Sequence, residues 1–128
     1  ETAGVIEPKT LHNISTLSFN VSPKLQSSGN EGRMRINPKA LRFFSDLEKE
    51  KQAVFKFVVT KENLQQDIKE ICELRDTYNL NNIYLMPAGS TPEEVKEGCL
   101  GLVEVCCKYG WRLTTRLHIT LWHNTRGK

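Results

Sequence analysis

Long apolar runs are missing from this chain of 128 residues. No segment approaches the roughly 18–20 consecutive apolar residues that a membrane-spanning helix needs, so we expect no such helix and no membrane partner. A strong excess of one charge is also missing, because 18 basic and 15 acidic side chains leave a formal net charge of only +3. This balance argues against a nucleic-acid-binding surface over the whole domain, but it allows a small anionic ligand.

Metal-binding spacings are missing too, although the chain has four cysteines and three histidines. No CxxC or CxxxCxxC occurs, which excludes a locally built zinc ribbon or a complete iron–sulfur motif. None of His12, His118 and His123 lies at a ligand spacing from another histidine or a cysteine. The adjacent Cys106 and Cys107 would point in different directions on a helix, which argues against a secreted disulfide framework. We therefore predict no metal site on this chain and a reducing, cytoplasmic compartment.

Motifs of common nucleotide-binding and hydrolase classes are absent as well. The chain contains neither GxGxxG nor GxxxxGK(S/T), and it has no serine nucleophile elbow. It begins at Glu1 rather than Met, and its first residues do not resemble a signal peptide, so we expect a fragment or a trimmed product. With 38% hydrophobic and 26% charged residues, the chain suits a single domain, residues 1–128, with a buried core.

Short β-rich runs alternate with amphipathic helical patterns along the chain. The runs at 17–22, 53–59, 82–86 and 111–117 predict strands, and a polar loop is expected at 23–37. Helices are predicted from Pro38 with Asn37 as N-cap, from Thr60 as N-cap, and from Thr91 to Gly110. The third helix begins with Thr-Pro-Glu-Glu, a capping-box pattern.

This alternation predicts βαβ units, and therefore an α/β fold with a parallel sheet. Ligands of such folds bind at the carboxyl ends of the strands. The expected ends lie at 22–24, 59–60, 86–89 and 117–118, and three of the four carry polar or Pro/Gly-rich sequence. We therefore expect a ligand site along this edge of the sheet.

Three polar residues lie beside the expected ligand edge. Lys24 and Arg116 could pair there with a carboxylate or a phosphate, whereas for most basic residues of the chain a solvated surface is the simpler interpretation. His118 follows the last predicted strand between two apolar neighbours. A histidine in apolar company is more often structural than catalytic, but its place at a strand end favours a site. Both interpretations stay open at this point.

Several short segments of the chain resemble one enzyme family. They are Glu1-Thr2-Ala3-Gly4 with Ile6-Glu7-Pro8, Phe19-Asn20-Val21-Ser22-Pro23-Lys24-Leu25 with Ser28-Gly29, Leu85-Met86-Pro87, and Trp111-Arg112-Leu113 through Arg116-Leu117-His118 to Asn124-Thr125-Arg126-Gly127. Together they resemble the 7-carboxy-7-deazaguanine synthases, radical S-adenosylmethionine enzymes of the 7-deazapurine (queuosine-type) pathway. The resemblance runs along essentially the whole chain, in order and at sensible spacings.

The resemblance implies a fold and a reaction. The fold is a partial (β/α) barrel of the radical S-adenosylmethionine type, of which this chain would be the C-terminal half. The reaction converts 6-carboxy-5,6,7,8-tetrahydropterin into 7-carboxy-7-deazaguanine with loss of ammonia. Members of the family use a reduced 4Fe–4S cluster, S-adenosylmethionine and Mg²⁺, and they are usually homodimers.

The resemblance also implies roles for residues that would bind the substrate. Glu1 would hydrogen-bond the pterin, because a carboxylate suits the donors of its amino-pyrimidine ring. His118, together with Arg116, would reach the carboxylate side of the substrate. No residue of this chain is assigned a catalytic role.

For the cofactor, the resemblance implies that Ser22 and Lys24 contact S-adenosylmethionine and that Met86 and Pro87 line its pocket. The family's CxxxCxxC motif, Mg²⁺ ligands and glycine-rich segment belong to the N-terminal half and are absent here. We therefore expect that these 128 residues alone do not bind the cluster and are inactive by themselves. An exposed sheet edge would then favour a homo-oligomer or association with the missing half.

Two other functions stay open on the sequence. The chain could be a separate ligand-binding or regulatory α/β module that keeps the pocket without the cluster chemistry. It could also be a plain structural fragment, whose function is that of the parent protein. Binding of a ligand without cleavage of S-adenosylmethionine would favour the module.

Overall fold

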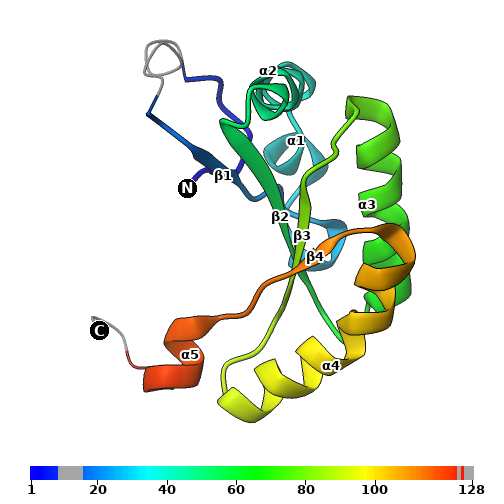
Figure 1. The fold of residues 1–128 in the computed structure, drawn as a ribbon. Coiled ribbons are helices and arrows are strands. Elements are labelled where there is room, and N and C mark those ends of the chain that lie inside the picture. Colours follow the sequence, from blue (N-terminus) through cyan, green and yellow to red (C-terminus); the bar gives the residue numbers. More distant parts are fainter. Residues whose placement is uncertain (9–15, 124, 126–128) are drawn as a thin grey trace.

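The computed structural model describes residues 1–8, 16–123 and 125. Parallel strands alternate with helices along the chain, which confirms the predicted α/β class (Figure 1). The strands are β1 (Phe19–Val21), β2 (Ala53–Val59), β3 (Ile83–Pro87) and β4 (Arg112–Leu113). The helices are η1 (Gln26–Ser28), α1 (Gly32–Arg35), α2 (Pro38–Lys49), α3 (Leu64–Tyr78), α4 (Pro92–Tyr109) and α5 (Leu117–Trp122).

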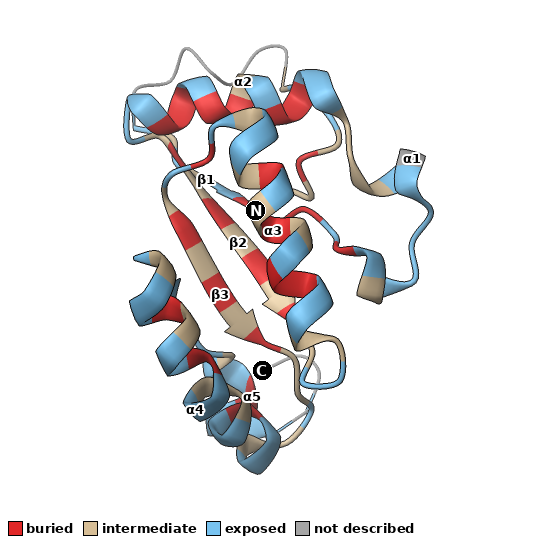
Figure 2. Cartoon of the chain, turned by 90° about the vertical axis from the view of Figure 1, so that its right-hand side faces the viewer, coloured by how far each residue is buried: buried red, intermediate tan, exposed pale blue. Residues whose placement is uncertain are grey.

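The four strands form one sheet in the order β1-β2-β3-β4, and all neighbouring strands are parallel. Helices α2, α3 and α4 lie along one face of this sheet, while the opposite face is left open by them (Figures 1 and 2). Thr2 forms a further parallel bridge with Val21, so the first residues of the chain extend the sheet beyond β1. This arrangement is consistent with half of a (β/α) barrel.

The core lies between the sheet and the three helices. Phe55 and Phe57 of β2 and Leu85 of β3 are fully buried, and they pack with residues such as Phe44 of α2 and Ile71 of α3. The residues between them on each strand are only half-buried, which gives β2 and β3 their striped pattern in Figure 2. Because side chains alternate along a strand, every second residue is turned away from the helices and onto the open face.

The predicted helix ends are largely confirmed. The Asn37 side chain accepts from the N–H groups of Lys39 (3.1 Å) and Ala40 (3.3 Å), so Asn37 is the N-cap of α2. Thr91 and Glu94 form both bonds of the capping box of α4, and the helix ends at the left-handed Gly110. Within the described residues, no helix combines the length and the apolar character needed to cross a membrane.

The start of α3 differs from the prediction. The helix begins at Leu64 after a turn, and Asn63 rather than Thr60 occupies its N-cap position. Thr60 has another role: its hydroxyl accepts from Asn63 N–H at 3.3 Å, and its own N–H donates to the buried Asp67 carboxylate at 3.0 Å. The hydroxyl therefore stabilises the turn that precedes the helix. The expected loop at 23–37 also differs, since it contains η1 and α1.

The last predicted strand, 111–117, is wrong over most of its length. Only Arg112 and Leu113 pair with β3, and Thr114 donates a final hydrogen bond to Leu85 at 2.9 Å. The chain then turns into α5, because a helical conformation buries Ile119 completely. The predicted strand end at 117–118 is therefore the start of a helix, and β4 ends at Leu113. The first strand is also shorter than predicted.

Two glycines of α4 provide a test of this packing. A Cβ at Gly98 would lie 2.5 Å from Cβ of Pro87 on β3, whereas a Cβ at Gly101 would meet nothing within 4 Å. We expect Gly98→Ala to lower the free energy of unfolding by about 1–3 kcal/mol through overpacking. Gly101→Ala should raise it by up to about 1 kcal/mol through helix propensity. Urea denaturation of both variants measures this, and equal effects would contradict the contact between α4 and β3.

Candidate functional site

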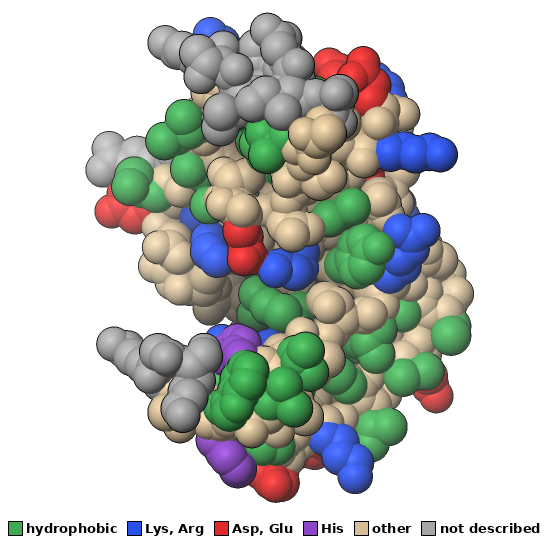
Figure 3. Space-filling view, turned by 60° about the vertical axis from the view of Figure 1, so that its left-hand side comes forward, with side chains coloured by type: hydrophobic (Ala, Val, Ile, Leu, Met, Phe, Trp, Pro, Cys, Tyr) green, Lys and Arg blue, Asp and Glu red, His purple; other side chains and the backbone are tan. Residues whose placement is uncertain are grey.

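Polar side chains form a row across the open face of the sheet. In the strand register Lys56 of β2 lies beside Tyr84 of β3, and Tyr84 lies beside Arg112 of β4. Lys56 and Tyr84 alternate with buried core residues, so they are turned away from α2, α3 and α4. We call Lys56, Tyr84 and Arg112 the polar row. In Figure 3, basic side chains lie beside acidic ones across the middle of this side of the molecule, above a patch of hydrophobic and histidine side chains.

The first residues of the chain bring Glu1 to the same face. Thr2 bridges Val21 of β1, and its carbonyl accepts from Ser22 N–H at 2.7 Å. Gly4 allows the close packing that follows, because its φ is +71° and a Cβ would lie 2.7 Å from Cγ1 of Val21. Glu1 is therefore placed by main-chain pairing of its neighbours with β1.

Glu1 forms an ion pair with the polar row. Its Oε1 lies 2.6 Å from Lys56 Nζ; the Lys56 side chain is 21% exposed and the Glu1 side chain 62% exposed. The hydrogen bond from Lys56 holds the pKa of Glu1 below its ordinary value of 4.5, and the charge of Lys24 acts in the same direction. Glu1 thus presents an ionised carboxylate at neutral pH.

Four of the residues singled out from the sequence gather around this face. Ser22 directly follows β1 and is 5% exposed, and Lys24 follows it as an exposed residue close enough to Glu1 to affect its pKa. Met86 lies two residues beyond Tyr84 on β3, half-buried and on the same face. The structure therefore brings Glu1, Ser22, Lys24 and Met86 to one side of the sheet.

The other three candidates lie in different surroundings. Pro87 is buried on the helix side of β3, against Gly98 of α4. Arg116 is at the N-cap of α5, and its Nη1 donates to the carbonyl of Gly89, which links α5 to the loop after β3. Arg116 thus lies beside the carboxyl edge, as expected. His118 is exposed in the first turn of α5 and does not end a strand.

The three residues of the polar row were not singled out from the sequence. Two of them could have been found from the alternation of side chains along each strand. Lys56 lies among apolar residues in AVFKFVV, and Tyr84 lies between two buried residues in IYLMP. Because successive side chains point to opposite faces, a polar residue between two core residues is expected on the open face. Arg112 has no such signal, because its strand is only two residues long.

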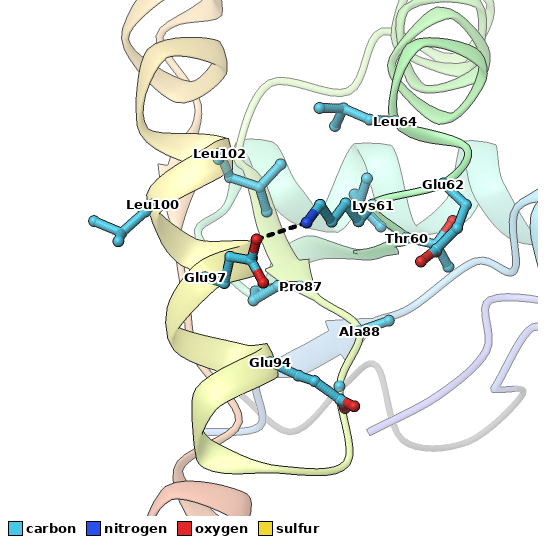
Figure 4. Close-up of a pocket in the computed structure, with 14 residues that line it drawn as sticks. Thr60, Lys61, Glu62, Leu64, Pro87, Ala88, Glu94, Glu97, Leu100 and Leu102 are labelled. Carbon is cyan, nitrogen blue, oxygen red and sulfur yellow. Dashed lines mark hydrogen bonds and ion pairs between the residues drawn. The ribbon is translucent and has the colours of Figure 1, made fainter.

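A separate cleft of about 650 Å³ lies on the helix side, at the carboxyl ends of β2 and β3 (Figure 4). Its apolar lining residues include Pro87, Leu64 and Leu102. Lys61 and Glu97 form an ion pair across it at 2.6 Å, with both side chains mostly exposed. Two more carboxylates, Glu62 and Glu94, line the cleft, so its lining has more acidic than basic side chains.

The cysteines do not form a metal site. All four are free, and they lie on α3 (Cys72) and along α4 (Cys99, Cys106 and Cys107). Burial raises the pKa of the Cys106 thiol, which disfavours the thiolate that a metal requires. Among the described residues no group of three or more His, Cys, Asp or Glu side chains could hold a metal ion. These residues therefore do not fit an iron–sulfur cluster.

The Glu1–Lys56 pair predicts a measurable change in acidity. Replacing Lys56 by Met should raise the pKa of Glu1 toward its ordinary value, because the hydrogen-bond donor and the positive charge are lost. In the native protein the pair stabilises the fold above the ordinary pKa of Glu1, and this contribution is lost as the pH falls through the lowered value. An NMR titration of the Glu1 carboxyl measures the shift. Lys61→Met, which removes the pair with Glu97, is the control and should leave Glu1 unchanged.

Comparison with known proteins supports the family resemblance. The chain is 31% identical, over 130 aligned residues, to the 7-carboxy-7-deazaguanine synthase of Pyrobaculum aerophilum. The match covers 100% of this chain and 53% of the relative, so the chain spans about half the length of the curated relative it matches. No family model and no solved structure matches the chain. The resemblance to 7-carboxy-7-deazaguanine synthases is therefore confirmed over the full length of the chain, and the covered share is consistent with the C-terminal part of such an enzyme.

Proposed function

We propose that this chain is the C-terminal part of a 7-carboxy-7-deazaguanine synthase. The enzyme would convert 6-carboxy-5,6,7,8-tetrahydropterin into 7-carboxy-7-deazaguanine in a 7-deazapurine pathway such as queuosine biosynthesis. The observation that carries the proposal is the similarity to a named synthase along the whole chain. The open polar face of the sheet adds support, because it presents hydrogen-bonding and charged groups where a barrel of this type encloses its ligands.

In this proposal Glu1 accepts hydrogen bonds from the amino-pyrimidine end of the pterin. The ion pair with Lys56 supports this role, since it keeps the carboxylate ionised and directed over the sheet. Arg116 and His118 would reach the carboxylate side of the substrate, and they would approach it from the carboxyl edge of the sheet. For Arg116 this requires the guanidinium donors that are not bonded to the Gly89 carbonyl.

The cofactor would lie next to Glu1 on the same face. Ser22 and Lys24 lie beside this position, Met86 lies on the same face nearer the carboxyl end of β3, and Pro87 would support the site from behind that strand. S-adenosylmethionine, when bound, supplies the organic radical that removes a hydrogen atom from the pterin. The cluster and the Mg²⁺ ion do not fit the described residues of this chain. We assign them to the half of such an enzyme that the chain does not match.

Two further properties belong to this proposal. We expect the chain to act as a homo-oligomer or in association with the other half of the enzyme, because at one edge its sheet ends in the short bridge of Thr2 to β1. We also expect a cytoplasmic location, since its cysteines are free and its reaction needs a reduced cluster.

The reaction itself provides the test. The complete polypeptide that contains these residues is incubated without oxygen, with S-adenosylmethionine, Mg²⁺, a reductant and 6-carboxy-5,6,7,8-tetrahydropterin. We expect 7-carboxy-7-deazaguanine by mass spectrometry, and Glu1→Gln should lower kcat/KM by about tenfold or more because hydrogen bonds to an ionised group are strong. Glu104→Gln, an exposed change on α4, is the matched control and should leave kcat/KM unchanged. An unchanged rate for Glu1→Gln would remove Glu1 from the site.

A ligand-binding module without the chemistry is the second candidate. It is favoured by one observation: the described residues contain no group that could hold the cluster. Such a module would bind a carboxylated pterin but form neither product nor 5′-deoxyadenosine, even in the complete polypeptide. Formation of both compounds would reject this alternative.

A further inference from the structure

Arg112 is a basic residue of the open sheet face whose hydrogen-bond partners are all neutral. Its Nη1 group donates to two neutral acceptors, the Asn82 side-chain oxygen and the Tyr84 hydroxyl, the latter at 3.0 Å. Its guanidinium also lies over the Tyr84 ring, with Cζ 5.4 Å from the centroid. No carboxylate pairs with Arg112 within the described part of the chain. Its orientation is therefore set by neutral groups, and its charge is left uncompensated.

One side of the Arg112 guanidinium is available to bind an anion. A guanidinium has five N–H donors, and its Nε–Nη2 side can bind both oxygens of a carboxylate at once. The two bonds of Arg112 both use Nη1, so among the described residues the Nε–Nη2 side has no hydrogen-bond acceptor. Asn82 and Tyr84 thus hold the residue in place through Nη1 and leave the Nε–Nη2 side for an anion.

Lys56, the other cation of the polar row, differs from Arg112 because a carboxylate pairs with it. Lys56 is neutralised by Glu1 at 2.6 Å, so an anion gains less from it than from Arg112. The two ends of the row therefore differ: the Glu1–Lys56 end offers a carboxylate to hydrogen-bond donors, and the Arg112 end offers donors to an anion. Lys56 and Arg112 lie two strands apart, which corresponds to about 10 Å between their Cα atoms. This is the scale of a two-ring heterocycle with polar groups at its opposite ends.

We propose that Arg112, in addition to Arg116 and His118, binds the carboxylate of the ligand on the open sheet face, with Asn82 and Tyr84 as the residues that position it. This inference rests on the proposed function, which supplies a ligand with a donor-rich ring at one end and a carboxylate at the other. It fixes the orientation of that ligand: the amino-pyrimidine end faces Glu1, and the carboxylate faces β4.

Binding of two related pterins tests the proposal. The probes are 6-carboxypterin and pterin, which share the ring system and differ in the carboxylate, and their fluorescence is titrated with the complete polypeptide in the presence of Mg²⁺. We expect Arg112→Met to weaken the binding of 6-carboxypterin by about tenfold or more, because a charge-assisted bidentate contact is lost, and to leave the binding of pterin unchanged. Arg112→Lys should recover part of the loss, since it keeps the charge but not the planar geometry. Arg42→Met, an exposed arginine on the helix side, is the control and should bind both pterins as the native protein does.

The outcomes separate this proposal from the function on which it rests. A native protein that binds neither pterin would overturn the proposed function and the assignment of Arg112 with it. A native protein that binds 6-carboxypterin, together with an Arg112→Met variant that loses nothing, would overturn the role of Arg112 alone. An equal loss for both pterins would do the same, since it would show that Arg112 only supports the fold; thermal unfolding of the variant identifies that case.

Discussion

The sheet of this protein is covered by α2, α3 and α4 on one face only, and most of its other features follow from that constraint. Phe55, Phe57 and Leu85 must face these helices to leave water, and strand geometry then turns their neighbours to the opposite side. The neighbours include Lys56 and Tyr84, which apolar burial would exclude from the core. The packing that stabilises the fold therefore also assembles the polar face where a ligand can bind.

Charge is distributed unevenly over this face. The charges of Glu1 and Lys56 neutralise each other at one end of the polar row, but the Glu1 carboxylate oxygens can still accept hydrogen bonds there. Arg112 is held by neutral partners and keeps its charge. On the helix side two basic residues are paired with carboxylates, Lys61 with Glu97 in the cleft and Arg35 with Glu70 between α1 and α3. Arg112 therefore differs from both of these residues, because no carboxylate among the described residues pairs with it.

Prediction from the sequence worked best where local patterns decide the structure. The strand at Ala53–Val59 and the capped starts of α2 and α4 depend on side-chain alternation and on hydrogen bonds within a few residues, and all are confirmed. Prediction from the sequence failed where contacts between residues far apart in the chain determine the local structure. Arg116 donates a hydrogen bond to the Gly89 carbonyl, 27 residues away, and Ile119 is completely buried in α5, where the sequence pattern predicts the end of a strand. The candidate site shows the same division, since Ser22 and Met86 were singled out from motifs, whereas Arg112 was not.

By itself the sequence determined the α/β class, the parallel alternation of strands and helices and the resemblance to 7-carboxy-7-deazaguanine synthases, because these depend on periodicity, capping residues and short motifs. Only the tertiary structure decided which side chains share a face. Glu1 reaches Lys56 because Thr2 pairs with β1, and Arg112 joins Tyr84 because β4 pairs with β3. These residues lie far apart along the chain, and strand register brings them together, which no local pattern specifies.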